Sequence, residues 1–196
     1  MKRFFLLAVF LLAVPVWAHA PRLINQSTSS DCGPAALATL LTFYLDTPAS
    51  EKEMMLLAQA TPKTGTSLLG LQQASALKGC AAESFRMNFA TLQNQLAAYP
   101  TPVIVRILLP EPHFVVVLKV GDEIAISDPA SSHQWMTQKA FLDRWLIPGT
   151  KEGYVFVAAR PDGSFNQDNL DQTLAELAQS RRTLQTLRAP AYRPWR

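Results

Sequence analysis

The pattern of apolar and polar positions divides the chain into a helical first half and a strand-rich second half. After Asp31, apolar residues recur at helical spacing, which predicts a buried helix over about 32–45. Asp31 is a favoured N-cap residue, and Ser50 followed by Glu53 predicts a capping box. The predicted helices of this half cover about 32–45, 50–60, 67–78 and 90–99.

The second half changes to runs of β-branched and aromatic residues separated by turn residues. The predicted strands cover about 80–85, 103–109, 113–120, 123–129 and 154–160, with a helix inserted at 137–146. Gly121 and Asp122 form a tight turn, so strands 113–120 and 123–129 should pair as an antiparallel hairpin. The order of helices first and strands later predicts one α+β domain, with a helical N-terminal half packed on an antiparallel sheet.

The composition changes after Pro161. Five leucines at helical spacing predict an extra C-terminal amphipathic helix: Leu170, Leu174, Leu177, Leu184 and Leu187. This helix either packs back on the domain or serves as a mobile docking segment. We therefore divide the mature chain into a domain at 21–160 and a C-terminal helix with its tail at 161–196.

The first twenty residues, 1–20, have the layout of a secretory signal peptide. Lys2 and Arg3 precede an apolar run of thirteen residues, Phe4 to Val16, and Ala18-His19-Ala20 offers a cleavage site. The run is shorter than the roughly 20 residues that span a bilayer. We expect cleavage after about Ala20, a periplasmic or secreted protein, and no integral membrane segment in the mature chain.

Charge and composition narrow the classes of partner. Without Lys2 and Arg3, the 18 basic residues of the chain fall to 16, against 15 acidic ones. A nucleic-acid-binding protein would be expected to carry a concentrated basic surface, so no nucleic-acid partner is predicted. At 17% charged and 48% hydrophobic residues, the composition is that of a globular protein.

Cys32 is the residue whose role decides the function. It could be a small buried residue, half of a disulfide with Cys80, a metal ligand or a nucleophile. An exported protein can hold a disulfide, although Cys80 lies in an apolar stretch where a free buried cysteine is ordinary. The chain has no CxxC, HxxxH or HExxH motif, so we predict neither a metal nor a cofactor.

The surroundings of Cys32 favour a nucleophile. The start of a helix supplies free N–H groups and partial positive charge that stabilise a thiolate. His113 stands at the start of one strand of the predicted hairpin, and Asp128 stands near the end of the next strand. The hairpin register brings these two residues close together, so that Asp128 could orient the imidazole of His113 as a general base.

Two further residues enter the candidate site. His133 is the alternative base; it lies in the polar stretch "SSHQW", which we interpret as an exposed or substrate-facing loop. Gln26 lies six residues before Cys32, and its side-chain amide could serve as an oxyanion donor beside a backbone N–H.

These residues together resemble peptidase family C39. The resemblance rests on Gln26 and Cys32 within "QSTSSDCGPAAL", followed by "PHFVVVLKV" and "ISDPA", and it covers about 25–159. It implies a papain-like cysteine peptidase fold, with Cys32 as nucleophile, His113 as base and acid, Asp128 as the orienting residue and Gln26 in the oxyanion hole. Familiar members of the family cleave leader peptides as domains of peptide-exporting transporters.

The resemblance and the signal peptide together imply a stand-alone, exported member of the family. We therefore expect a cysteine endopeptidase that cleaves a secreted or periplasmic protein or peptide, within a secretion or surface-fibre assembly system. The C-terminal helix is the expected contact to a secretion-apparatus partner. Two alternatives stay open: a substrate-binding module that does not cleave, and a cell-wall peptide amidase with the same thiol chemistry.

Overall fold

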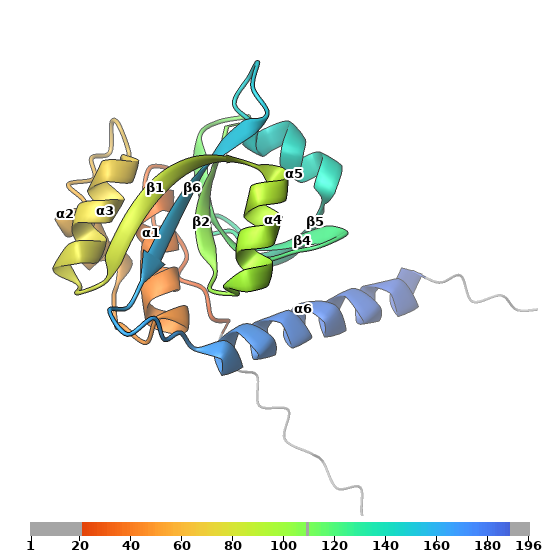
Figure 1. Ribbon diagram of the computed structural model, residues 1–196. Coiled ribbons are helices and arrows are strands. Elements are labelled where there is room, and N and C mark those ends of the chain that lie inside the picture. Colours follow the sequence, from red (N-terminus) through yellow and green to blue (C-terminus); the bar gives the residue numbers. More distant parts are fainter. Residues whose placement is uncertain (1–20, 109, 189–196) are drawn as a thin grey trace, which may run out of the picture.

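The computed structural model describes residues 21–108 and 110–188, which contain a six-stranded antiparallel sheet with helices on both faces (Figure 1). The order across the sheet is β1-β6-β2-β3-β4-β5. The strands are β1 Ala81–Asn88, β2 Val103–Ile107, β3 His113–Val120, β4 Glu123–Ser127, β5 His133–Thr137 and β6 Glu152–Ala159. The helices are α1 Cys32–Thr39, the π-helix η1 Leu40–Tyr44, α2 Glu51–Leu57, α3 Leu68–Leu77, α4 Phe89–Ala98, α5 Gln138–Trp145 and α6 Gln167–Arg188.

The predicted α+β fold, with a helical N-terminal half on an antiparallel sheet and an extra C-terminal helix, is confirmed. The predicted signal peptide, residues 1–20, lies outside the described residues, and its cleavage stays a prediction. Within residues 21–108 and 110–188, no helix is both long enough and apolar enough to cross a membrane.

The central strands are apolar on both sides because helices cover both faces of the sheet. In β3, Phe114 and Val116 belong to a core shared with α1, η1, α2 and α3. Val115 and Val117 point the other way, into a second core shared with α4 and α5. This arrangement explains why the strand is a continuous apolar run, where a sheet with one solvated face would alternate apolar and polar residues.

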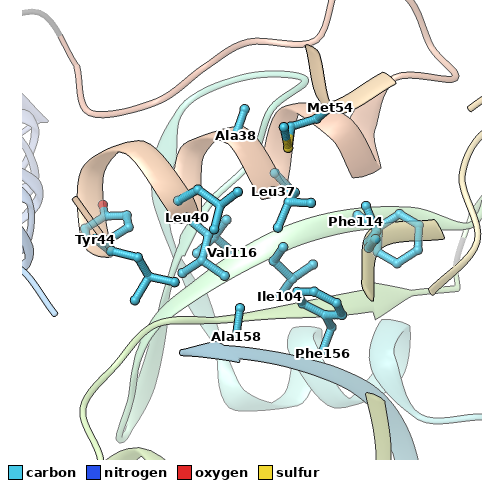
Figure 2. Close-up of a cluster of buried hydrophobic side chains, with 14 of the residues drawn as sticks. Leu37, Ala38, Leu40, Tyr44, Met54, Ile104, Phe114, Val116, Phe156 and Ala158 are labelled. Atoms are coloured by element: carbon cyan, nitrogen blue, oxygen red, sulfur yellow. The ribbon is translucent and has the colours of Figure 1, made fainter. Parts of the chain in front are cut away.

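Helix α1 lies in the middle of the first core (Figure 2). All eight of its residues are buried; Leu37 points toward the sheet, and Ala38 points away from it (Figure 2). The predicted helix over 32–45 is helical to Tyr44, with the π-helix η1 as its last part. Asp31 occupies the N-cap position, but its carboxylate accepts hydrogen bonds from Thr28 and Ser30 and does not cap the helix.

Other helix starts follow the sequence signals more closely. Ser50 and Ser67 accept hydrogen bonds from the backbone N–H groups of Glu53 and Gly70, as N-cap residues do. The Glu53 side chain does not complete the predicted capping box; it forms an ion pair with Lys78 at 2.8 Å. The sequence signal therefore locates the start of the helix but not the partner of Glu53, because Lys78 lies at the end of another helix, α3.

The polar stretch around His133 is a strand, which corrects the interpretation of this stretch as a loop. β5 pairs with β4 along its whole length, from Ser127 opposite His133 to Glu123 opposite Thr137. It forms an edge of the sheet, where polar side chains can stay partly exposed, so the stretch lacked the apolar alternation of a half-buried strand. Thr137 then caps α5 by accepting a hydrogen bond from the N–H of Ala140.

The first part of helix α6 packs back on the domain, as one of the two alternatives for the C-terminal segment expected. Its first turns pack on the domain, where Leu170, Thr173 and Leu177 are buried. From Gln179 to Thr186 every residue is exposed, and Leu184 retains 55% of its accessible surface. The helix is thus docked at its beginning and leaves its far half in solvent (Figure 1).

We predict that Gly153→Ala destabilises the fold, because an added Cβ would overlap the indole ring of the fully buried Trp145. Overpacking of this kind costs about 1–3 kcal/mol. Urea unfolding should show a lower midpoint for Gly153→Ala. Gly121→Ala is the control, since its added Cβ would have no heavy atom nearer than 3.7 Å. Equal midpoints for both variants and the parent would contradict this packing.

Candidate active site

Cys32 is the first residue of α1 and is 7% exposed. Its position is fixed by the burial of α1, which places the thiol against the start of β3. Burial alone raises the pKa of the Cys32 thiol, but hydrogen bonding and charge from His113 oppose this effect. The backbone N–H groups of Phe114 and Gly33 also favour the thiolate, and the net pKa lies below the ordinary value of 9.0.

His113 is the first residue of β3 and lies between Cys32 and Asp128. Its Nε2 atom is 2.7 Å from Oδ1 of Asp128, so Nδ1 is the ring nitrogen left for the thiol. Burial lowers the pKa of His113, but the carboxylate and the thiolate on its two sides outweigh burial and raise this pKa to about 9. The shifts of both pKa values favour a thiolate beside an imidazolium.

Asp128 follows the last residue of β4. Burial raises the pKa of its carboxyl, but the hydrogen bond and charge of His113 and the N–H of Ala130 lower it overall. The β3–β4 register pairs Val116 with Ser127, which puts Asp128 opposite Val115, two positions from His113 on the same face. Diagonal neighbours at this spacing are within reach of long side chains. The two residues thus meet diagonally across the hairpin.

Gln26 lies at the His113 and Asp128 end of the site. Its backbone N–H donates to the carbonyl of Pro129 at 3.0 Å, and its Nε2 donates to the carbonyl of Thr28 at 2.8 Å. Its Oε1 is buried and has no hydrogen-bond partner among the described residues. Gln26, His113 and Asp128 line one cavity of about 360 Å³, so the structure brings the predicted amide to the predicted base.

A second groove, of about 340 Å³, opens on the Cys32 side. The turn at 62–66 forms one wall, and Arg106, Glu111 and Phe114 contribute to the lining. Sequence reasoning missed Arg106, although a single charged residue inside the apolar run "VIVRILL" is a signal that its side chain reaches solvent. It also missed Phe114, because an aromatic residue in a buried strand is normally a core residue.

The remaining cysteine and histidine lie elsewhere. Cys80 is a free, buried thiol whose Sγ is 3.7 Å from Oγ1 of Thr47, and no disulfide joins it to Cys32. His133 Nδ1 is 2.7 Å from Oγ of the buried Ser127, which corrects its interpretation as an exposed loop residue. Burial lowers the pKa of His133.

Among the described residues, no group of three or more His, Cys, Asp or Glu side chains could hold a metal ion.

Comparison with known proteins identifies the family of this chain. The family model described as "Peptidase C39 family" matches residues 21–150. An uncharacterized protein of Methanothermobacter marburgensis is 38% identical over 109 residues, which cover 55% of this chain and 71% of that protein.

Two relatives carry functional names. The Lactococcin-G-processing and transport ATP-binding protein LagD of Lactococcus lactis is 33% identical over 140 residues, 68% of this chain and 19% of that protein. The probable functional amyloid protease FapD of Pseudomonas aeruginosa is 30% identical over 131 residues, 63% of this chain and 56% of that protein. The similarity therefore spans about a fifth of the first relative and just over half of the second.

Solved structures share the fold. The peptidase domain of Streptococcus ComA, a bi-functional ABC transporter, superposes with a TM-score of 0.61 at 24% identity and covers 70% of this chain and 97% of that domain. A double glycine motif protease from an AMS/PCAT transporter, solved with its leader peptide, gives a TM-score of 0.57 at 21% identity, with 69% and 89% covered. Since the family model spans most of the described chain, this protein belongs to the peptidase C39 family.

Proposed function

We propose that the protein is an exported cysteine endopeptidase that hydrolyses a peptide bond in a secreted or periplasmic protein or peptide. The observation that carries the proposal is the alignment of Cys32, His113 and Asp128, with the imidazole held at 2.7 Å from the carboxylate. Family membership supports the same reaction class. The signal-peptide pattern at 1–20 supports the exported setting, and the likeness to a probable functional amyloid protease supports proteolysis.

In the first half of the reaction, the Cys32 thiolate attacks the carbonyl carbon of the scissile peptide bond. The carbonyl oxygen takes up negative charge, and Gln26 with a backbone N–H at the start of α1 stabilises it. The His113 imidazolium donates its proton to the departing amine nitrogen. The C–N bond then breaks and leaves the acyl group on Cys32 as a thioester.

In the second half, water hydrolyses the thioester. His113, now neutral, accepts a proton from the attacking water, and Asp128 holds the ring in the required orientation. The C–S bond breaks, the acyl product leaves as a carboxylic acid, and Cys32 returns as the thiolate beside protonated His113. The cycle needs no group beyond the substrate and water.

The substrate segment lies along the two cavities that flank Cys32 and His113 in this proposal. The peptidase domain occupies 21–160, and the exposed far half of α6 is the proposed contact to a secretion-apparatus partner. Cleavage of secreted proteins would support an endopeptidase. Tight substrate binding without cleavage would favour a non-cleaving binding module, and release of amines from purified wall peptides would favour an amidase.

We predict that Cys32→Ala abolishes cleavage, because no other group in the site can form the thioester. The measurement is the appearance of new peptide termini, by mass spectrometry, in a proteome-derived peptide library and in exported proteins. Cys80→Ala is the matched control and should keep its activity, since Cys80 is buried away from the site. Equal activity of Cys32→Ala and the parent protein would refute the proposal.

We predict that the rates of thiol alkylation and of peptide cleavage depend differently on pH above about 9. Iodoacetamide should modify Cys32 below pH 9.0, because the pKa of this thiol is lowered, and His113→Ala should slow the reaction there. As pH rises through about 9, His113 loses the proton that the leaving amine requires, so kcat/KM for cleavage should fall while alkylation continues. Parallel decline of both rates would contradict the assigned roles.

We predict that Gln26→Ala slows cleavage by about 10²-fold, in line with the loss of one oxyanion donor. Iodoacetamide labelling of Cys32 should be unchanged, because alkylation forms no oxyanion. A variant that cleaves as fast as the parent would remove Gln26 from the oxyanion site. Slower labelling in this variant would show that Gln26 supports the thiolate instead.

A further inference from the structure

The extended segment at 22–26, which we call the N-terminal strap, is tied to α6 by a buried arginine. Arg22 is 7% exposed, although it lies near the start of the described chain. Its guanidinium donates to Oδ1 of Asn169 and to Oε1 of Glu176, both at 3.0 Å, and also to Oε1 of Gln172. A buried guanidinium needs such partners to offset its lost hydration, and all three come from one face of α6.

The other end of the strap is tied to the active site. The N–H of Ile24 donates to Oγ1 of Thr39 in α1 at 2.9 Å, and the N–H of Gln26 donates to the carbonyl of Pro129 at 3.0 Å. Pro129 follows Asp128 directly. The strap contains no helix or strand, so its path is set by these bonds, by the Arg22 cluster, and by the burial of Leu23 and the packing of Ile24 on the core. Its alternate residues 22, 24 and 26 make the three attachments.

Helix α6 is itself anchored firmly where it binds Arg22. The N–H of Asn166 donates to the carbonyl of Tyr44 at 2.8 Å, and Nδ2 of Asn169 donates to the carbonyl of Phe43 at 2.8 Å. Tyr44 also hydrogen-bonds the buried Thr173 at 3.4 Å. The α6 residues of these anchors lie beyond residue 150, where the match to the family model ends.

We propose that Arg22 is a positioning residue and that α6, through Arg22, holds the strap so that Gln26 stays at the His113 and Asp128 end of the site. Without this clamp, Leu23 stays buried and the backbone bonds of Ile24 and Gln26 and the bonds of Ser27 to Glu51 remain, but the strap loses its tie to α6 and Gln26 shifts from the oxyanion more often. The proposal rests on the proposed function for the role of Gln26, and on the observed contacts for the coupling of α6 to the strap.

The test combines a double-mutant cycle with amide hydrogen exchange. Arg22→Met removes the charge and the hydrogen bonds but keeps an apolar stem. We expect it to slow cleavage by about tenfold or more, with unchanged iodoacetamide labelling of Cys32. In a Gln26→Ala background, Arg22→Met should cause no further loss, because it acts through Gln26. Independent, multiplicative losses would overturn the proposal.

Hydrogen exchange keeps the inference separate from the proposed function. The Gln26 amide, bonded to Pro129, should exchange about tenfold faster or more in Arg22→Met, whether or not the parent cleaves any peptide. Unchanged protection of that amide would overturn the proposal. If the parent cleaves no peptide but Gln26 exchanges faster in Arg22→Met, the proposed peptidase function is refuted and the proposed role of Arg22 stands.

Two further variants guard against a simple loss of stability. Arg181→Met removes another arginine of α6 that pairs with a carboxylate, that of Glu123, away from the strap. It should leave cleavage and Gln26 exchange unchanged. Glu176→Ala removes the charged partner of Arg22 at a partly exposed position, and it should change both readouts in the same direction as Arg22→Met. Equal effects of Arg181→Met and Arg22→Met would mean that Arg22 acts only on the overall stability of the fold, and this would overturn the proposal.

Discussion

Close contact between the first turn of α1 and the start of β3 determines the chemistry of this protein. A Cβ added to Gly33 would come within 3.1 Å of both the Phe114 ring and the Cβ of Thr66, so the glycine allows the helix to approach. That approach places Cys32 beside His113. Burial of the apolar side chains of α1, Leu37 among them, against the apolar face of the sheet supplies the free energy that holds the two elements together (Figure 2).

The same burial opposes the charges that the site needs. It raises the pKa of Cys32 and lowers that of His113, and each effect disfavours an ion pair. The site overcomes burial by setting a carboxylate, an imidazole and a thiol in a row, with backbone N–H groups facing the sulfur. The proposed site therefore depends on three elements packed together: Cys32 begins α1, His113 begins β3, and Asp128 follows β4.

The sequence was sufficient where the signal is local. Most elements were predicted from N-cap serines, the β3–β4 turn and the spacing of apolar residues. The hairpin turn also predicted that His113 lies near Asp128. The β5 strand was missed because an edge strand can be polar. Asp31 holds the predicted N-cap position, but its carboxylate bonds to Thr28 and Ser30 and does not cap the helix. The Arg22 cluster on α6 joins residues about 150 positions apart, and no local pattern predicts such a contact.

The charge state of His113 tests the account most directly. Nitrogen-15 NMR of the ring, followed across pH in the parent and in Cys32→Ala, would measure it. The account predicts that the His113 ring of the parent has a pKa of about 9, above the ordinary value of 6.5, and so keeps both ring protons at neutral pH. Removal of the thiolate in Cys32→Ala should lower this pKa. A parent ring that titrates near 6.5, with no change in the variant, would contradict the ion pair and the mechanism built on it.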